Sequence, residues 1–364
     1  MKDFVSVNDP VFVQPEKYGF FDKLFLNLIR DERDLPFIYL SLKITFFMIL
    51  PGIALFFPLP GYIWWPLAIF YFYLNNLVFK GSFGLMLHCT SHRPFFKQKV
   101  GFMNHYLPWF VGPFFGQTPE TYFVHHLGMH HVENNLEDDL SSTMHYQRDS
   151  FKDFMKYFLS FVSTGLLDTA KYFNIRQNNR FRNKLLFGEI LYIVVCVVLF
   201  YFNPAATFMV FVLPYLISRF IMMLGNWTQH SFVDYTDPGN CYKNSINCIN
   251  TSYNNKCWND GYHINHHIRP SLHWTEYPIH FLENLDEFSK NKALIFDGIH
   301  YLHVWFYLMN KNYKKLAQHL VNIHGTFSSE EEAIELMQSR TKKMEIRGIT
   351  MRSLKKSGSV SVAT

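Results

Sequence analysis

The sequence predicts an all-α integral membrane protein with four transmembrane helices in two hairpins and a cytosolic helical cap that carries a histidine-rich metal site. Composition is the first reason: 49% of the 364 residues are hydrophobic, 18% are aromatic and only 17% are charged. One water-soluble core of this size does not accommodate so many apolar residues. The second reason is the presence of bilayer-length apolar segments, and the third is the placement of lysine and arginine outside them.

The four expected spans form two pairs, and each pair is joined by a short turn that contains proline. Each span is close to the roughly 20 residues that a bilayer requires. The spans cover residues 35–57, 62–79, 185–202 and 205–224. No strong helix breaker follows the second span, so we expect its helix to continue out of the membrane to about His92.

Charge predicts the sidedness of these hairpins. The two hairpin tips carry no charge, whereas the N-terminal, central and C-terminal segments hold the lysines and arginines. Both termini and all the histidine runs should therefore face the cytosol. We divide the chain into a cytosolic N-terminal segment (1–34), a membrane domain (35–327) and a C-terminal helix with a polar, disordered tail (328–364), and we find no signal peptide.

Three further segments are apolar but interrupted by charged or polar residues, which is typical of helices that lie at the membrane interface or re-enter it. These segments cover residues 101–116, 151–173 and 293–309. The net charge of +5 is spread over the polar segments. Contact with anionic lipid explains it better than nucleic acid does, and no nucleic-acid partner is expected. The odd number of cysteines, five, is typical of reduced thiols that face a cytosol.

Histidine is the residue that carries the chemistry. Ten of the 18 histidines lie in short runs just outside the apolar spans. These runs are His88 and His92; His125, His126, His130 and His131; His230; and His263, His266 and His267. Imidazoles three or four residues apart share one face of a helix, and a cation makes such crowding tolerable, so the runs predict a metal site.

The donor set restricts the metal. The runs contain almost no carboxylate or thiolate, which disfavours calcium and magnesium and favours iron, zinc, copper or nickel. A zinc peptidase would need the motif His-Glu-x-x-His, which is absent. Nine or ten imidazoles are too many for one ion but suffice for two with room for dioxygen. A pair of irons beside a lipid-facing tunnel is suited to oxidising an unactivated C–H bond.

At this level of detail the chain resembles the membrane fatty acid desaturases with three histidine boxes. The resemblance extends from about Leu35 to Trp274. It includes H-x-x-x-H at residues 88–92, H-x-x-x-H-H at 126–131 and H-x-x-H-H at 263–267. The segment Asn226-Trp-Thr-Gln-His230 matches the family pattern of an asparagine four residues before a further histidine ligand.

The resemblance implies a non-haem diiron enzyme that uses dioxygen to desaturate a fatty acyl chain held as a lipid or thioester. It implies His230 as a ligand and Asn226 as a water-mediated one. The full ligand set it implies is His88, His92, His126, His130, His131, Asn226, His230, His263, His266 and His267. No haem-binding signature is present, so electrons should come from a separate ferredoxin or cytochrome.

Two departures from the family pattern affect which reaction is expected. Cys89 stands where the first box commonly has an acidic residue, and the second box has three residues, rather than two, before its paired histidines. The longer spacing resembles the alkane hydroxylase branch. Hydroxylation of a lipid, sterol or carotenoid is therefore the alternative reaction, and a histidine-rich divalent-metal transporter is the alternative from another class.

Some neighbouring residues receive a plainer interpretation. His125 is an alternative member of its run, either a ligand or a support for the ligands next to it. Asp138 and Asp139 could orient ligands or be solvated carboxylates, and we prefer the second interpretation. The eight histidines outside the runs are interpreted as surface or hydrogen-bonded side chains.

Overall fold

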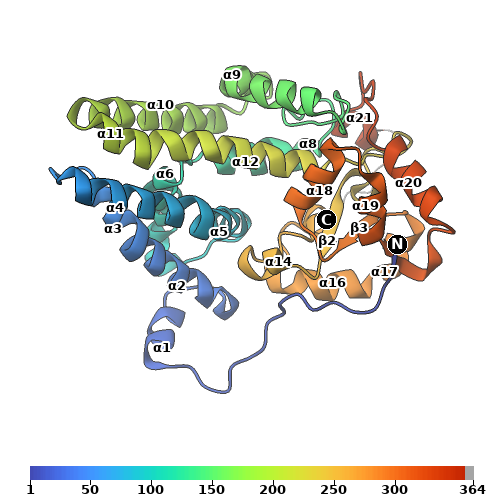
Figure 1. The fold of residues 1–364 in the computed structure, drawn as a ribbon, viewed down its shortest axis with the longest axis horizontal. Helices are drawn as coiled ribbons and strands as arrows, with labels where there is room; N and C mark the ends of the chain where they lie inside the picture. The colour runs from blue at the N-terminus through green and yellow to red at the C-terminus, as the bar shows by residue number, and fades with distance from the viewer. Residues whose placement is uncertain (357–364) are drawn as a thin grey trace. The chain divides into compact units, whose positions relative to one another are not determined.

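The computed structural model describes residues 1–356 and is mostly helical (Figure 1). The predicted polar tail lies almost entirely outside these residues. The chain divides into two compact units that alternate along the sequence. Unit 1 comprises residues 1–11, 126–169 and 221 onward, and unit 2 comprises residues 12–125 and 170–220. The helices α9 (Phe151–Ile175) and α12 (Leu213–Gln229) contribute residues to both units.

Unit 2 consists of helices, some of which contain short 3₁₀ or π segments, labelled η. Its elements before residue 126 are α1 (Phe20–Leu26), η1 (Glu32–Asp34), α2 (Leu35–Ile44), η2 (Thr45–Ile49), α3 (Leu50–Ala54), α4 (Gly61–Tyr73), η3 (Leu74–Phe79), α5 (Lys80–His92), η4 (Gln98–His105), η5 (Tyr106–Val111), α6 (Gly112–Phe114) and α7 (Thr121–His125). The later elements are α10 (Asn179–Phe202), α11 (Pro204–Thr207) and η7 (Phe208–Val212).

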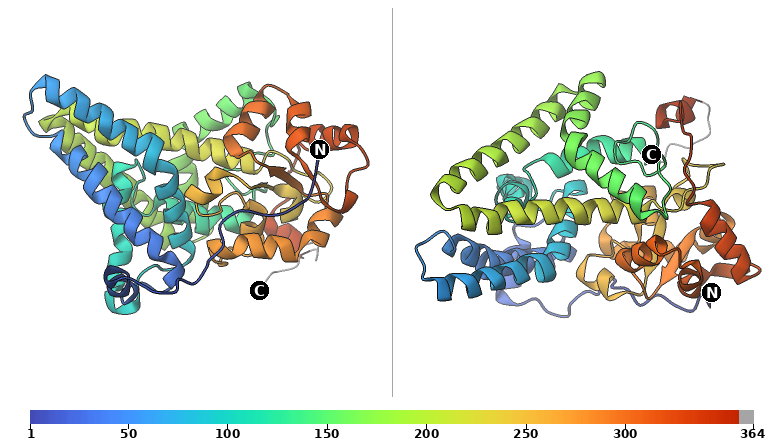
Figure 2. Two further views of the ribbon diagram at one scale, coloured as in Figure 1. Left: turned by 60° about the horizontal axis from the view of Figure 1, so that its bottom comes forward. Right: turned by 45° about the horizontal axis from the view of Figure 1, so that its top comes forward.

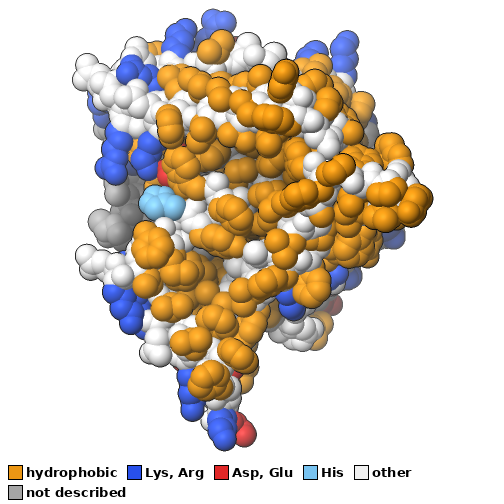
Figure 3. Space-filling view, turned by 90° about the vertical axis from the view of Figure 1, so that its left-hand side faces the viewer, with side chains coloured by type: hydrophobic (Ala, Val, Ile, Leu, Met, Phe, Trp, Pro, Cys, Tyr) orange, Lys and Arg blue, Asp and Glu red, His pale blue; other side chains and the backbone are white. Residues whose placement is uncertain are grey.

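Among residues 1–356, three helices are long and apolar enough to cross a membrane, namely Glu32–Ala54, Asn179–Phe202 and Pro204–Gln229. Many of their apolar side chains are exposed, among them Phe46 at 58% and Val197 at 65%. Hydrophobic side chains cover the face of the molecule shown in Figure 3. Exposed apolar helices of this length indicate a membrane protein, because only lipid makes such a surface favourable.

The expected second span is helical but less apolar than the other three. Residues 61–92 form one continuous helical stretch of α4, η3 and α5, as predicted, and it carries His88 and His92 near its end. This stretch is not one of the three helices that are long and apolar enough to cross a membrane. Asn75 and Asn76 lower its hydropathy. Asn75 is fully buried and donates a hydrogen bond to the Phe114 carbonyl oxygen at 2.8 Å, so its amide has a protein partner.

A buried ion pair accounts for Glu189, a charged residue in an expected span. Its carboxylate lies 2.8 Å from the Arg219 guanidinium and accepts a hydrogen bond from the Thr118 hydroxyl at 2.6 Å. All three side chains are buried. Pairing and hydrogen bonding together offset the cost of placing these charges away from water.

Unit 1 contains four short strands that the sequence analysis did not predict, in addition to helices. The strands are β1 (Lys2–Asp3), β2 (Ile246–Ile249), β3 (Leu294–Asp297) and β4 (Val321–Asn322). The pairs β1–β4 and β2–β3 are both parallel. All four residues of β2 are buried, and such a short run gives no alternating pattern in the sequence.

Unit 1 also contains helices, several of which pack around these strands (Figure 2). The helices of unit 1 are η6 (His126–His130), α8 (His131–Glu133), α13 (Cys241–Asn244), α14 (Ser252–Lys256), α15 (His263–Ile268), η8 (Trp274–Glu276), α16 (Tyr277–Glu283), α17 (Leu285–Lys290), α18 (Tyr301–Met309), α19 (Tyr313–His319), η9 (Ile323–Gly325), α20 (Glu330–Ser339) and α21 (Met351–Lys356). The hydroxyl of Ser329 caps α20, whose first turn is acidic.

Gly261 allows the loop before α15 to lie against β2. Its backbone N–H donates to Asn254 Oδ1 at 3.0 Å, and its carbonyl accepts from the Cys248 N–H at 2.7 Å. A Cβ atom at this position would overlap the Cys248 carbonyl oxygen and the Asn254 side chain. Only glycine therefore lets this loop place His263 beside the strand.

Replacing Gly261 by alanine should destabilise the protein by about 1–3 kcal/mol, because backbone has to move to admit the methyl group. Thermal unfolding in detergent would measure this as a lower Tm. The matched control is Gly225→Ala, since a Cβ there meets no atom within 4 Å. Equal Tm values for the two variants would contradict the close approach.

Candidate metal centre

The second histidine run lies on a π-helical segment. Residues 126–130 form η6, and α8 begins at His131. A π-helix aligns residues five apart, whereas an α-helix aligns residues four apart. Accordingly, Nε2 of His131 lies 3.0 Å from Nε2 of His126. The wider π-helical turn thus accommodates the three-residue spacing of this box. His130 points away from the His126–His131 pair.

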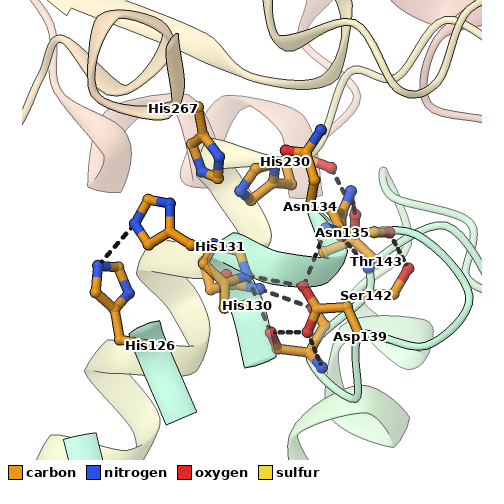
Figure 4. A network of polar contacts seen from close by, with 12 residues as sticks. His126, His130, His131, Asn134, Asn135, Asp139, Ser142, Thr143, His230 and His267 are labelled. Carbon is orange, nitrogen blue, oxygen red and sulfur yellow. Dashed lines mark hydrogen bonds and ion pairs between the residues drawn. The ribbon is translucent and has the colours of Figure 1, made fainter. Parts of the chain in front are cut away.

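An asparagine turn after α8 returns the chain to His130. Asn134 and Asn135 adopt left-handed φ angles of 50° and 61°, a conformation that asparagine tolerates better than most residues. The turn brings Asp139 to His130, where Oδ2 of the carboxylate lies 2.8 Å from the ring Nδ1 (Figure 4). Asp139 is 2% exposed and also accepts hydrogen bonds from the Asn135 N–H and from Ser141.

His230 follows the last residue of α12 and is fully buried. Its Nδ1 donates to the backbone carbonyl oxygen of Asn244 at 2.9 Å, which leaves Nε2 with its lone pair for a metal. The Asn244 amide donates to the carbonyl oxygen of Asn134 and accepts from the Asn135 amide. One polar network therefore orients His230 and the turn behind the second run (Figure 4).

The third run forms the short helix α15. His263 and His267 are four residues apart, and their Nε2 atoms lie 3.0 Å apart. His266 faces another direction, where its Nε2 lies 2.9 Å from Nε2 of His131. The Tyr277 hydroxyl, from α16, lies 3.0 Å from Nδ1 of His266 and fixes the orientation of this ring.

Seven of the histidines of unit 1 thus form two separate groups. His126, His131 and His266 make one, which we call group A, and their available ring nitrogens lie within 4.8 Å of one another. His130, His230, His263 and His267 make the other, group B, with the same limit.

The donor sets fit metal ions. Facing Nε2 atoms within the groups are 2.9–3.2 Å apart. Two nitrogens that bind one ion at about 2.1 Å and at a right angle would be about 3.0 Å apart. In His130 and His230 the outer nitrogen is already bonded to a carboxylate or a carbonyl, so the inner one offers a lone pair. These all-imidazole sets suit iron or another transition metal.

Burial keeps the His230 and His267 rings of group B neutral. It lowers the pKa of His230 to about 4, with a further contribution from His130. Burial, and then the neighbouring rings led by His263, hold the pKa of His267 well below its ordinary value. Neutral imidazole is the form that binds a metal, so the packing prepares the ligands at neutral pH.

The remaining predicted residues take different positions. In unit 2, His88 and His92 lie on α5 with ring centroids 5.3 Å apart. Asn226 donates hydrogen bonds to the Ser141 carbonyl oxygen at 2.9 Å and to the Tyr157 hydroxyl at 2.7 Å. His125 ends α7 and contributes to neither group.

One interpretation was wrong, and other participants were missed. Asp139 is not a solvated carboxylate, because it is buried against His130. The sequence gives two adjacent aspartates after the second run, and nothing in it distinguishes Asp139 from the half-buried Asp138. Asn244 and Tyr277 also support ligands, but neither lies in a pattern that would reveal it, since their roles depend on tertiary packing.

Comparison with known proteins identifies one match. Residues 62–298 match the family model described as fatty acid desaturase. The matched range covers well over half of the chain and contains all nine histidines of the predicted ligand set. Comparisons with curated proteins and with solved structures gave no match.

Replacing Asp139 by asparagine should weaken metal binding by about 10-fold to 100-fold, because the amide cannot orient His130 as the carboxylate does. Metal content after dialysis against a graded chelator series would measure this. Asp138→Asn is the matched control and should leave the metal content unchanged. Equal loss from both variants would contradict the role of Asp139.

The metal-free protein should become less stable as the pH falls below about 6.5. The unfolded chain binds a proton at His230 near pH 6.5, whereas the buried ring binds one only near pH 4, so acid favours unfolding. Protonation of this one ring in the unfolded chain should lower the free energy of unfolding by about 2 kcal/mol at pH 5. Denaturant unfolding of metal-free protein at pH 7 and pH 5 would measure it. In a His230→Asn variant, the free energy of unfolding should depend less on pH. An unchanged pH dependence would refute the assignment of this effect to His230.

Proposed function

The chain belongs to the fatty acid desaturase family, and on this premise we propose that it is a membrane-bound, non-haem diiron oxidoreductase that desaturates a fatty acyl chain with dioxygen. The observation that carries the proposal is the division of seven histidines of unit 1 into two groups with inward-facing ring nitrogens. Two groups suit two ions. We further propose four membrane spans, with the termini and the histidines on the cytosolic side.

Each group would hold one iron. We assign the first iron to group A and complete its ligands with His88 and His92, which the family resemblance implies. We assign the second iron to group B, with Asn226 acting through a water molecule. Bound iron would supply the activation of dioxygen needed to remove hydrogen from an unactivated carbon.

The protein itself contributes orientation and exclusion of water. Asp139 and Asn244 fix the rings of His130 and His230 from behind, so these ligands need no rearrangement when a metal binds. Burial of His263 and His266 at 3% exposure keeps bulk water from the ring nitrogens. A separate ferredoxin or cytochrome would supply the electrons, and a membrane lipid or acyl thioester would supply the chain.

Hydroxylation is the second candidate reaction, and one observation favours it. The second box carries the longer H-x-x-x-H-H spacing, and the π-helical segment η6 accommodates the extra residue. This spacing resembles the alkane hydroxylase branch. Product analysis would distinguish the two reactions, because desaturation removes two hydrogens and hydroxylation adds one oxygen.

The wild-type protein, expressed in a desaturase-deficient host, should bind roughly two iron ions per chain, one for each group. His130→Ala should remove iron from group B, His266→Ala should remove iron from group A, and both should abolish turnover. Metal analysis of purified protein and lipid profiling by mass spectrometry would measure these outcomes. His303→Ala, an exposed histidine outside both groups, is the matched control.

The variants also test the completion of group A. His88→Ala should lower the iron content to about half, as His266→Ala does, if His88 is a ligand. Full iron content in His88→Ala would remove this residue from the ligand set. Full activity in either His130→Ala or His266→Ala would overturn the proposed function.

A further inference from the structure

A second candidate site lies in unit 1 and shares no residue with the histidine groups. It is a pocket of about 580 Å³ between the segment before α9, the end of α18 and the end of α20. Three lysines line it, namely Lys311, Lys342 and Lys343. Asp149 and Tyr313 lie on its wall. The proposed reaction uses none of these residues.

The pocket has a net positive charge, because three lysines line it with one carboxylate, Asp149. Among the described residues, none of the three lysine side chains forms an ion pair, and all three are exposed. The one carboxylate in the wall, Asp149, accepts hydrogen bonds from the Tyr313 hydroxyl at 2.8 Å and from the Gln147 amide at 2.6 Å. Neutral donors therefore occupy both of its oxygens. The lysines remain available to an anion from outside.

A buried guanidinium offsets the charge of Asp149. Arg148, next to Asp149 in the chain, is fully buried and donates to the carbonyl oxygens of Ser231 at 3.0 Å and of Arg340 at 2.9 Å. Burial lowers its pKa to about 9, so it stays protonated at neutral pH. Its charge attracts that of Asp149, so the three lysines determine the positive potential of the pocket.

The helices that follow or precede the pocket residues in the chain, α9 and α18, carry exposed apolar side chains. Phe151, two residues after Asp149, is 54% exposed, and Phe306 and Leu302 of α18 are 58% and 53% exposed. The Trp305 ring packs on the rings of Phe151 and Phe154, with centroids 6.2 Å and 5.3 Å apart. This contact holds α9 and α18 together. Both helices therefore carry exposed apolar side chains close in sequence to Asp149 or Lys311, which line the pocket.

We propose that this pocket binds the phosphate-bearing headgroup of an anionic phospholipid, whose acyl chains lie along the exposed apolar residues of α9 and α18. A concave pocket of this size fits a headgroup better than the surface of an acidic protein. The adjoining apolar side chains favour a lipid over free phosphate, because a soluble anion would leave them in water. Binding here would anchor unit 1 to an anionic membrane surface.

The test uses the full-length, iron-loaded protein in neutral detergent, with phosphatidylglycerol as the probe and phosphatidylcholine as the neutral comparison. Native mass spectrometry would count the lipids that each chain retains over a titration. A triple variant with Lys311→Gln, Lys342→Gln and Lys343→Gln should bind phosphatidylglycerol roughly 100-fold more weakly, because each lysine contributes about five-fold. The matched control, of equal charge change, carries Lys256→Gln, Lys290→Gln and Lys355→Gln.

Four results decide the proposal. Loss of phosphatidylglycerol from the first triple variant, with retention by the control, supports it. Equal binding by both variants overturns it. Displacement of the lipid by inorganic phosphate at the same concentration assigns the pocket to a free anion. If the first variant binds lipid as the wild type does and excess electron donor restores its turnover, the lysines bind an acidic protein and not a lipid. Iron content equal to that of the wild type confirms that the variants fold.

Discussion

The rest of the structure depends on one constraint, which is the contact between the ring nitrogens of neighbouring neutral imidazoles. Two facing lone pairs at about 3 Å repel unless a proton on one of the ring nitrogens, or a cation, lies between them. The surroundings hold the rings in this arrangement. Asp139 bonds to His130, and the Asn244 carbonyl bonds to His230, each from the side away from the neighbouring rings. Stability of the metal-free protein and affinity for the metal are therefore coupled.

Local backbone features position these rings. The π-helical segment η6 pairs His126 with His131 and sends His130 to the other group. Left-handed asparagines turn the chain back toward His130, and Gly261 lets the loop before α15 lie on β2. Each feature is unfavourable or unusual alone, and the packing around the site maintains it. The same buried network satisfies the polar groups that the features expose.

Polar groups among the apolar helices follow the same rule. The Asn75 amide nitrogen donates to a backbone carbonyl, and Glu189 pairs with Arg219, so both find partners within the protein. The lysine pocket near α9 contrasts with them, because its charges are left for an external partner. Buried polar groups with internal partners point to structure, whereas exposed charges beside apolar side chains point to binding.

The sequence by itself determined the mostly helical membrane class, the continuation of the second helix to His92 and the family, because hydropathy and histidine spacing are local properties of the chain. Tertiary structure alone decided how the histidines are shared between two groups. Helical register predicts a pair from His126 and His130, but the wider π turn pairs His126 with His131. Tertiary structure also decided that Asp139 is a buried partner of His130 and that β2 and β3 form a parallel pair. Both features depend on contacts between residues that are separated in the chain, and no local sequence pattern records such contacts.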